Sequence, residues 1–344
     1  MIMRNKIAFL LISVSILVFF ILNLVLGTIS IPLSSIWNIL FGTGKESEIW
    51  QNIIWKSRFP QTITALAAGA GLSISGLQMQ TVFRNPLAGP SELGISSGAS
   101  LGVAFIILLS GNIAGTALSR LGLFGEVAIS FAAIAGAMAV MAIIMAISQR
   151  VRGNVILLII GVMIGYIATA IIGVLKFFSN DEDVRAYVIW GLGSFAKVSG
   201  NQVYTFVIIM IVLIPLSFLL IKTLNLMLLG EGYARNLGLN VKRARLYVIA
   251  CSCVITAIIT AYCGPIVFLG LAVPHLCRTI FVSSDHRILM PAVTLTGASL
   301  ALFCNLVARM PGFEGALPIN SVTALIGAPI VISVLFGKRK NEIS

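Results

Sequence analysis

Few residues in this sequence of 344 residues are of the types that catalyse reactions or bind metals. It has two histidines, His275 and His286, and five cysteines, none of them in the C-x-x-C or cysteine/histidine spacing that binds zinc. All five cysteines lie in or beside apolar stretches: Cys251, Cys253, Cys263, Cys277 and Cys304. We therefore expect buried cysteines, no disulfide framework and no metal site.

One short segment has a weak likeness to a phosphate-binding loop. Gly44 and Lys45 could end such a loop, but Ile39 stands where the first glycine belongs and Glu46 follows the lysine. The sequence therefore predicts no ATPase in this chain, no enzymatic activity and no cofactor bound by it.

The longest polar interruption of the chain lies at about residues 227–245 and could recognise another protein. Glu231 and Arg235 are spaced i, i+4 with the acid first, which favours a helix-surface ion pair. Gly238 suits the left-handed end of a helix, and Asn240 is a good N-cap for the next one. The pattern predicts two short helices joined at a glycine corner and followed by a basic run. We expect a docking surface; the alternative is a solvated, positively charged loop.

The composition indicates which elements hold these residues. Hydrophobic residues make up 58% and charged residues 10% of the chain, and the mean hydropathy is +1.06. A soluble domain has about 25% charged residues. The sequence therefore predicts an all-α polytopic membrane protein, with residues 1–344 forming a single transmembrane domain. The 23 basic residues mostly flank apolar spans, without interleaved aromatics, so we expect membrane lipid and no nucleic acid as a partner.

Ten apolar stretches are each close to the ~20 residues that a helix needs to cross a bilayer. They cover about residues 7–26, 60–83, 94–110, 125–148, 155–178, 202–221, 246–263, 266–282, 288–309 and 319–337. The first is longer than the apolar core of a signal peptide and lacks a small-residue cleavage site, so it is predicted to be a helix that stays in the membrane. The least secure boundary is at Gly264 and Pro265, which divide one long apolar run into two.

Lysine and arginine in the loops predict the orientation. Most of the 23 lie on one side if both termini are cytoplasmic, and this orientation also places residues 229–245 in the cytoplasm. The expected location is the bacterial cytoplasmic (inner) membrane.

The spans contain almost no ionisable residue at mid-membrane depth. A proton- or sodium-coupled carrier would be expected to have buried acids, histidines or arginines on its pathway. Small residues occur instead, among them Gly161, Gly165 and Thr169 in the fifth span and Thr323 and Gly327 in the tenth. Such faces let helices approach closely, within the bundle or at a subunit interface.

Several motifs occur in a fixed order between about residues 58 and 337. They are Arg58-Phe59-Pro60, residues 69–78, Arg84-Asn85-Pro86-Leu87-Ala88-Gly89-Pro90, residues 93–99, residues 190–194, residues 264–275 with Pro274-His275, Asp285-His286-Arg287, and residues 317–319 and 327–329. In order and spacing the chain resembles the FecCD-type permease family of ABC importers for iron-siderophores, haem and cobalamin.

This resemblance implies a type II ABC importer permease fold with about ten transmembrane helices. It also implies a second permease subunit, identical or different, two cytoplasmic ATPase subunits that bind ATP and magnesium, and an extracellular or periplasmic substrate-binding protein. The polar loop then corresponds to the family's coupling loop to the ATPase. The residues implied are Glu231, Ala234, Arg235, Gly238 and Leu239.

On the outer side, the resemblance implies that basic residues receive acidic groups of the binding protein. The matching positions are Arg58 and Arg309, with Lys56 nearby. Gln61 stands where many relatives have a second arginine, so one contact could fall to a partner subunit. The alternative for both arginines is snorkelling at the membrane interface.

The resemblance also implies a short outer helix at about residues 184–194. Asp181, Glu182 and Asp183 precede this segment, and a complement to the helix N-terminus is favoured over attraction of cations.

The family's pathway follows the two-fold axis of the dimer, lined by the fifth and tenth spans. The matching residues are Gly153 and Asn154 near the inner gate and Met163, Tyr166 and Thr169 along the wall. The function expected is translocation of a ferric siderophore or related iron chelate by alternating access. The alternatives are haem or cobalamin as substrate, and a stand-alone secondary transporter or channel.

Overall fold

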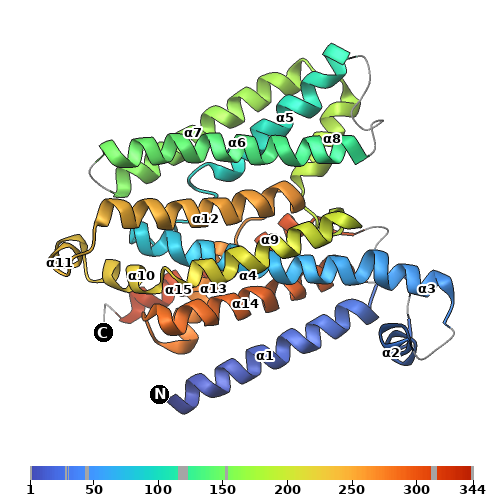
Figure 1. Cartoon of the computed structure of the whole chain (residues 1–344), viewed down its shortest axis with the longest axis horizontal. Helices are drawn as coiled ribbons and strands as arrows, with labels where there is room; N and C mark the ends of the chain where they lie inside the picture. Colours follow the sequence, from blue (N-terminus) through green and yellow to red (C-terminus); the bar gives the residue numbers. More distant parts are fainter. Residues whose placement is uncertain are drawn as a thin grey trace.

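The computed structural model describes residues 2–27, 29, 31–42, 46–114, 123–151, 154–310 and 316–341, and this part of the chain is helical without a strand. Ten long helices lie at the ten predicted spans (Figure 1). They are α1 (Ile2–Val25), α4 (Phe59–Phe83), α5 (Ile95–Ala114), α6 (Leu123–Arg150), α7 (Asn154–Phe177), α9 (Asn201–Phe218), α12 (Val241–Cys263), α13 (Leu269–Phe281), α14 (His286–Ala308) and α15 (Ile319–Asn341). The predicted all-α polytopic fold is confirmed.

Not every one of these helices crosses a bilayer by itself. Within the described residues, seven helices are long and apolar enough to span a membrane, whereas the apolar parts of α5, α13 and α15 are shorter. Helix α13 has 13 residues and is therefore about 20 Å long, less than the hydrocarbon thickness of ~30 Å. The expected span at 266–282 begins at Leu269 instead, because Gly264 and Pro265 leave the preceding segment non-helical.

Helix α4 is the centre of the bundle, buried along nearly its whole length between α9, α12, α13 and α14. Glycines allow this close packing. A Cβ on Gly76 would overlap the carbonyl oxygen of Gly270 in α13, and one on Gly69 would overlap that of Gly297 in α14. The small residues of the second predicted span thus hold neighbouring backbones in contact.

A second group of helices, α5, α6, α7 and α8 (Asp181–Gly191), lies beside the α4 group and joins it mainly through α6 against α12 (Figure 1). Helices α5 and α6 also pack through glycine, since a Cβ on Gly136 would overlap the carbonyl oxygen of Gly98. Gly94, at φ +77° just before α5, approaches the backbone of Gly161 in α7. The Gly161/Gly165 stripe of α7 therefore serves contact within this chain.

Helix α8 starts earlier than the expected outer helix at 184–194. It begins at Asp181, so that Asp181, Glu182 and Asp183 form its first turn. Acidic residues there complement the positive end of the helix dipole, which agrees with the favoured interpretation. The helix ends at Gly191, before Gly193 takes a left-handed conformation and the short 3₁₀ helix η3 (Phe195–Lys197) follows.

The two ends of the bundle differ in their short elements (Figure 1). One end, here called the α2 end, carries α2 (Leu33–Phe41), α3 (Glu48–Ile53) and the π-helix η1 (Ile54–Arg58). The four tryptophans lie here: Trp37, Trp50 and Trp55 in these three helices and Trp190 near the end of α8. The opposite end carries α10 (Ile221–Leu228) and α11 (Glu231–Asn236), and there α1 begins and α15 ends.

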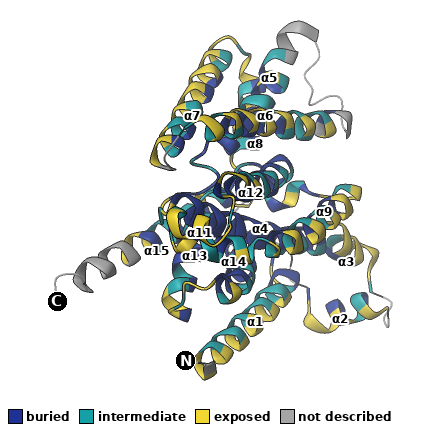
Figure 2. Cartoon of the chain, turned by 60° about the vertical axis from the view of Figure 1, so that its left-hand side comes forward, coloured by how far each residue is buried: buried dark blue, intermediate teal, exposed yellow. Residues whose placement is uncertain are grey.

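Several of the long helices carry many exposed residues (Figure 2). Helix α7 has little of its length buried and exposes Ile159, Met163, Tyr166 and Ile167. Helix α15 exposes Leu325 and Ile332. A membrane or another subunit is needed to cover such faces.

Candidate functional site

The polar interruption of the sequence forms a compact projection, here called the elbow (residues 229–240, with α11 at its centre). Gly230 enters it at φ +108° and Gly238 leaves it at φ +85°. The end of α11 is a Schellman motif, in which the Leu239 amide donates to the Ala234 carbonyl and the Gly238 amide to the Arg235 carbonyl, both at 2.9 Å. The predicted glycine corner is confirmed, and a side chain at Gly238 would strain it.

The second short helix predicted for this loop does not exist as a separate element. The Asn240 side chain accepts from the Arg243 amide at 3.1 Å, as an N-cap should, but the helix that it caps is the long α12. The basic residues Lys242, Arg243 and Arg245 are therefore the first turns of a spanning helix. The prediction was wrong because the basic run interrupts the hydropathy without interrupting the helix.

An ion-pair network fastens the elbow to α12. Arg235 Nη2 lies 3.5 Å from Glu231 Oε2, the predicted i, i+4 pair. Glu231 also accepts from Arg245, whose side chain is only 8% exposed. An exposed pair contributes little, whereas a buried arginine with one carboxylate partner fixes the geometry. The partner Arg245 was not among the predicted site residues.

The elbow faces outward with residues that were not predicted. Ala234 is fully buried, and Leu239 is half-buried against the bundle. Tyr233 is 72% and Leu237 60% exposed, and their i, i+4 spacing places them on one face of the elbow. Exposed tyrosine and leucine side chains on a projection of this kind are typical of a protein contact. The i, i+4 spacing of Tyr233 and Leu237 was visible in the sequence. The rest of this short helix is largely polar, so nothing in the sequence singled out the face with Tyr233 and Leu237.

The sequence motif Arg84-Asn85-Pro86-Leu87-Ala88 forms the turn that ends α4 beside the elbow. Arg84 is left-handed at φ 49°, and its guanidinium donates to the Met227 carbonyl at the end of α10 at 2.9 Å. Asn85 accepts from the Leu87 amide at 2.9 Å, which forms an Asx turn. Pro86 lies inside this turn and Ala88 is fully buried. The other motif pair, Pro274 and His275, is buried within α13.

At the α2 end, the three predicted docking residues lie in different environments. Lys56 is exposed, but Arg58 is only 1% exposed. Arg58 Nη1 donates to the carbonyls of Leu24 (2.6 Å) and Val25 (2.8 Å), and Nη2 donates to that of Ile29. Arg58 therefore closes the C-terminal end of α1 in this structure instead of presenting its charge on the surface. The snorkelling alternative fails as well, because its guanidinium is held by backbone carbonyls inside the protein.

Arg309 lies next to Arg58, and Gly27 separates the two. A Cβ on Gly27 would lie 3.0 Å from Arg58 Nη2 and 3.1 Å from Arg309 Nη2. Burial, together with the charge of Arg58, lowers the pKa of Arg309 to about 10. Arg309 Nη1 is buried and has no hydrogen-bond partner among the described residues. Two neighbouring positive groups with an unused donor favour an incoming carboxylate.

The predicted pathway residues lie on or before α7. Gly153 lies outside the described residues, and Asn154 is the first residue of α7. Met163 and Tyr166 are 48% and 66% exposed, and Thr169 is exposed with its hydroxyl donating to the Gly165 carbonyl at 2.9 Å. The structure therefore places three of the five predicted residues on the open face of α7.

One acid lies deep in the bundle, where the sequence predicted almost none. Glu92, between α4 and α5, lines a small cavity with Leu72, which is halfway along α4, and with Phe268 and Gly270 before and in α13. Its Oε2 atom is buried without a hydrogen-bond partner in the described structure. The segment after α4 thus turns back into the bundle, a path that hydropathy alone does not reveal.

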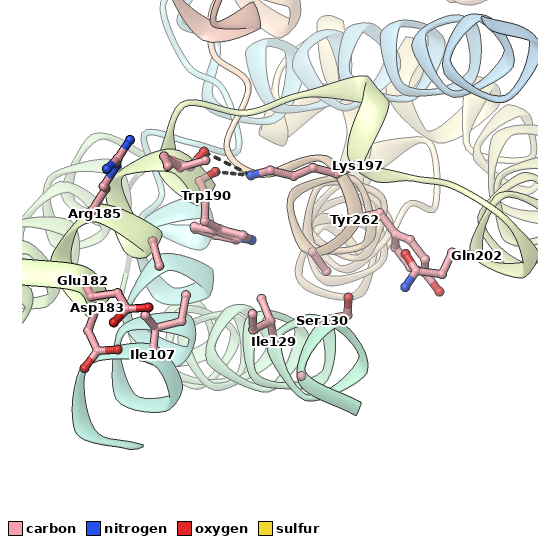
Figure 3. A pocket seen from close by; sticks show the side chains of 14 residues that line it. Ile107, Ile129, Ser130, Glu182, Asp183, Arg185, Trp190, Lys197, Gln202 and Tyr262 are labelled. Atoms are coloured by element: carbon pink, nitrogen blue, oxygen red, sulfur yellow. Dashed lines mark hydrogen bonds between the residues drawn. The ribbon is translucent and has the colours of Figure 1, made fainter. Parts of the chain in front are cut away.

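A cavity of about 520 Å³ is lined by residues of α6, α8, α9 and α12 (Figure 3). Trp190 and Tyr262 line it, together with the acids Glu182 and Asp183. Lys197 donates to the carbonyls of Ile189 (3.2 Å) and Trp190 (3.0 Å) at the end of α8, and burial lowers its pKa to about 8. Lys197 donates to the last carbonyls of α8 and complements the negative end of the helix dipole, so its charge already has a partner within the fold.

Metal binding has no support in the described residues. They contain no group of three or more histidine, cysteine or acidic side chains able to hold an ion. All five cysteines are free, and four of them are buried.

Known proteins resemble this chain along most of its length. The model of the FecCD transport family matches residues 15–337. The vitamin B12 import system permease protein BtuC of Klebsiella pneumoniae is 36% identical over 293 residues, which is 84% of this chain and 84% of BtuC. The hemin transport system permease protein HmuU of Yersinia pestis is 33% identical over 319 residues, 92% of this chain and 91% of HmuU.

A solved structure has the same fold. It is described as an inward-facing conformation of an ABC transporter of the metal-chelate type, and it superposes with a TM-score of 0.82 at 28% identity. The match covers 96% of this chain and 99% of the other.

Proposed function

Because this chain belongs to the FecCD transport family and is thus the membrane permease of an ABC importer, we propose that it carries a ferric siderophore or a related iron chelate across the bacterial cytoplasmic membrane. The relatives named for vitamin B12 and hemin support a bulky metal chelate as the substrate class. Haem and cobalamin are therefore the alternative substrates. The chain would translocate its substrate without itself being an enzyme, and the partner ATPase would bind ATP and magnesium.

The elbow is the observation that carries this proposal. It presents Tyr233 and Leu237 on a projection that Gly230 and the Schellman motif at Gly238 hold in one shape. We assign this face to the partner ATPase, with Glu231, Ala234, Arg235, Gly238 and Leu239 maintaining its geometry. A rigid projection can transmit the closure of the ATPases to the bundle, which then alternates between outward and inward access. The elbow end would then be cytoplasmic, as would both termini, which lie at that end of the bundle.

A second permease subunit would cover the open face of α7. Its exposed apolar residues need a partner, and α15 exposes Leu325 and Ile332 in the same manner. The substrate would pass between the two subunits along this face. Met163, Tyr166 and Thr169 would line the path, with Gly153 and Asn154 at its inner gate.

The α2 end would receive the external substrate-binding protein. Lys56 is exposed there, and the half-buried Arg309 retains an unused donor. We propose that these two residues meet acidic side chains of the binding protein, while Arg58 supports them from behind by holding the end of α1. The two ends of one rigid bundle would thus serve the two partners.

Transport by the reconstituted complex tests the function. The permease, its ATPase and the binding protein are placed in liposomes, and uptake of radioactive iron on a hydroxamate siderophore is compared with uptake of labelled haem and cobalamin. We expect ATP-dependent uptake of the iron chelate and none when ATP is withheld. Uptake that persists without ATP would instead support a stand-alone secondary transporter. ATP-dependent uptake of haem or cobalamin alone would retain the importer and replace the substrate.

The assignment of the elbow has its own control. Replacing Tyr233 with alanine should prevent the ATPase from co-purifying with the permease, because the exposed ring is lost from the contact face. Replacing Tyr204, which is equally exposed on α9 far from the elbow, should leave co-purification intact.

A further inference from the structure

Helix α10, which leads into the elbow, is fastened to the bundle by a cluster of polar side chains that the proposed function does not use. We call Thr81, Asn225, Asp285 and His286 the Asn225 cluster. Asn225 lies on α10, six positions before Glu231 at the start of α11. Thr81 is near the end of α4, and Asp285 and His286 begin α14. Four side chains thus connect three helices at the elbow end.

The hydrogen bonds of Asn225 fix the orientation of its amide. The backbone amide of His286 donates to Oδ1 at 2.9 Å, and this contact requires an oxygen. Nδ2 lies 2.6 Å from a carboxylate oxygen of Asp285, and this contact requires a donor. Both ends of the amide therefore have their assigned partners, and a flipped amide would lose both bonds.

The tautomer of His286 follows from this orientation. Its Nδ1 lies 2.8 Å from Asn225 Oδ1, which can only accept, so Nδ1 carries the proton. Nε2 lies 2.8 Å from the Thr81 hydroxyl oxygen, which also lies 2.8 Å from the Leu77 carbonyl oxygen. His286 is 1% exposed, so water does not compete for these bonds. A chain of hydrogen bonds thus runs from α4 through His286 to α10.

Asn225 bonds the start of α14 from another helix, in addition to that helix's own N-cap. Asp285 is the N-cap of α14 and accepts from the Arg287 amide at 2.8 Å, whereas Asn225 accepts from the His286 amide from outside the helix. Asn225 adds a link from this cap to α10. A second link lies two positions on, where Arg84 at the end of α4 donates to the Met227 carbonyl. Together, the bonds at Asn225 and Met227 attach the C-terminal half of α10 to α4 and α14.

We propose that Asn225 is a positioning residue that transmits displacement of the elbow to α4 and α14. This inference rests on the proposed function, because an ATPase must move the elbow. The central helix α4 and its close neighbour α14 would be displaced together with α10, since glycine contacts hold their backbones against each other. Loss of the link would leave the ATPase bound and active while the bundle no longer follows it.

A single variant, and a double variant that exchanges the side chains of Asn225 and Asp285, test the link. In Asn225→Asp, two carboxylates face each other where an amide met a carboxylate. The double variant combines Asn225→Asp with Asp285→Asn. The carboxylate at position 225 again accepts from His286, and the amide at position 285 donates to that carboxylate. Asparagine at position 285 still caps α14. Lys222→Ala is the matched control, because this exposed residue lies on the same helix.

The readout is substrate taken up per ATP hydrolysed in liposomes, with the ferric hydroxamate siderophore, haem and cobalamin used as probes. For Asn225→Asp we expect ATP hydrolysis near the wild-type rate and uptake per ATP reduced by about fivefold or more, the low end of allosteric couplings. The double variant should recover the wild-type ratio, and Lys222→Ala should keep it.

Three outcomes would overturn the inference. These are a wild-type ratio in Asn225→Asp, no recovery in the double variant, and equal losses of hydrolysis, uptake and melting temperature, which would indicate a structural role only. A wild-type complex without ATP-dependent uptake of any probe would refute the proposed function instead.

Discussion

Arg58 shows how a single side chain can take a role that its position in the sequence does not suggest. It follows the exposed Lys56 by two positions, in a segment expected to meet another protein. The π-helix that ends at Arg58 turns this side chain inward, where the carbonyls at the end of α1 have no helical partners. A guanidinium with five donors can satisfy several carbonyls at once. Gly27 leaves room for it, and also for Arg309.

Replacing Arg58 with alanine should therefore destabilise the protein. The substitution leaves the carbonyls of Leu24, Val25 and Ile29 without their donor and opens a space under α1. We expect a loss of about 2–4 kcal/mol, seen as a lower melting temperature in detergent. Lys56→Ala, from the same π-helix, should melt as the wild type does. Equal melting of all three proteins would show that Arg58 is not a structural residue.

At the scale of helices, glycine decides how closely α4 approaches its neighbours. Gly76 lies against the backbone of Gly270 with no space for a side chain. Neither residue has an unusual φ angle, so their role is close approach and not a turn. The central position of α4 therefore depends on residues that contribute no apolar side chain.

Gly76→Ala should separate α4 from α13. The added Cβ would overlap a main-chain oxygen, which cannot move without its helix, and overpacking of this kind costs about 1–3 kcal/mol. A lower melting temperature and a smaller yield of folded protein would be measured. Gly191→Ala is the control, since a Cβ there meets nothing within 4 Å. If Gly76→Ala melted like Gly191→Ala, the close approach would not limit stability.

The sequence predicted elements well where a local pattern determines them. The helices at the ten predicted spans follow from apolar length, and Gly238 and Asn240 follow from the backbone chemistry of helix ends. The prediction failed where distant segments decide the outcome. The burial of Arg58 depends on α1, the depth of Glu92 on the return of the chain into the bundle, and the continuity of α12 on packing that outweighs its polar first turn. The Asn225 cluster joins three segments and leaves no signal in any one of them.

At the scale of the whole molecule, the proposed pathway requires a second subunit beside the open face of α7. The open face of α7 carries Met163, Tyr166 and Thr169, whose hydroxyl donates to the Gly165 carbonyl of the same helix. A paired subunit would enclose these residues between two copies of the same surface, or between two related chains.

Cross-linking would detect this pairing. Tyr166→Cys in purified complex should be joined to the second permease by a bifunctional maleimide, because its side chain lies on the open face of α7. The mass of the product would distinguish an identical partner from a different one. Tyr204→Cys, exposed on α9, should give no such product. Absence of a cross-link at Tyr166 would argue against a subunit interface along α7.

The uneven distribution of tryptophan gives the protein a built-in optical reporter. Trp37, Trp50, Trp55 and Trp190 all lie at the α2 end, whereas the elbow at the far end contains none. Intrinsic fluorescence excited in tryptophan is thus blind to events at the elbow itself. If a non-fluorescent ligand or a tryptophan-free partner binds the elbow and the emission changes, a conformational change must have passed along the helices to the α2 end. The time course of the emission would give the rate of that change without an attached dye.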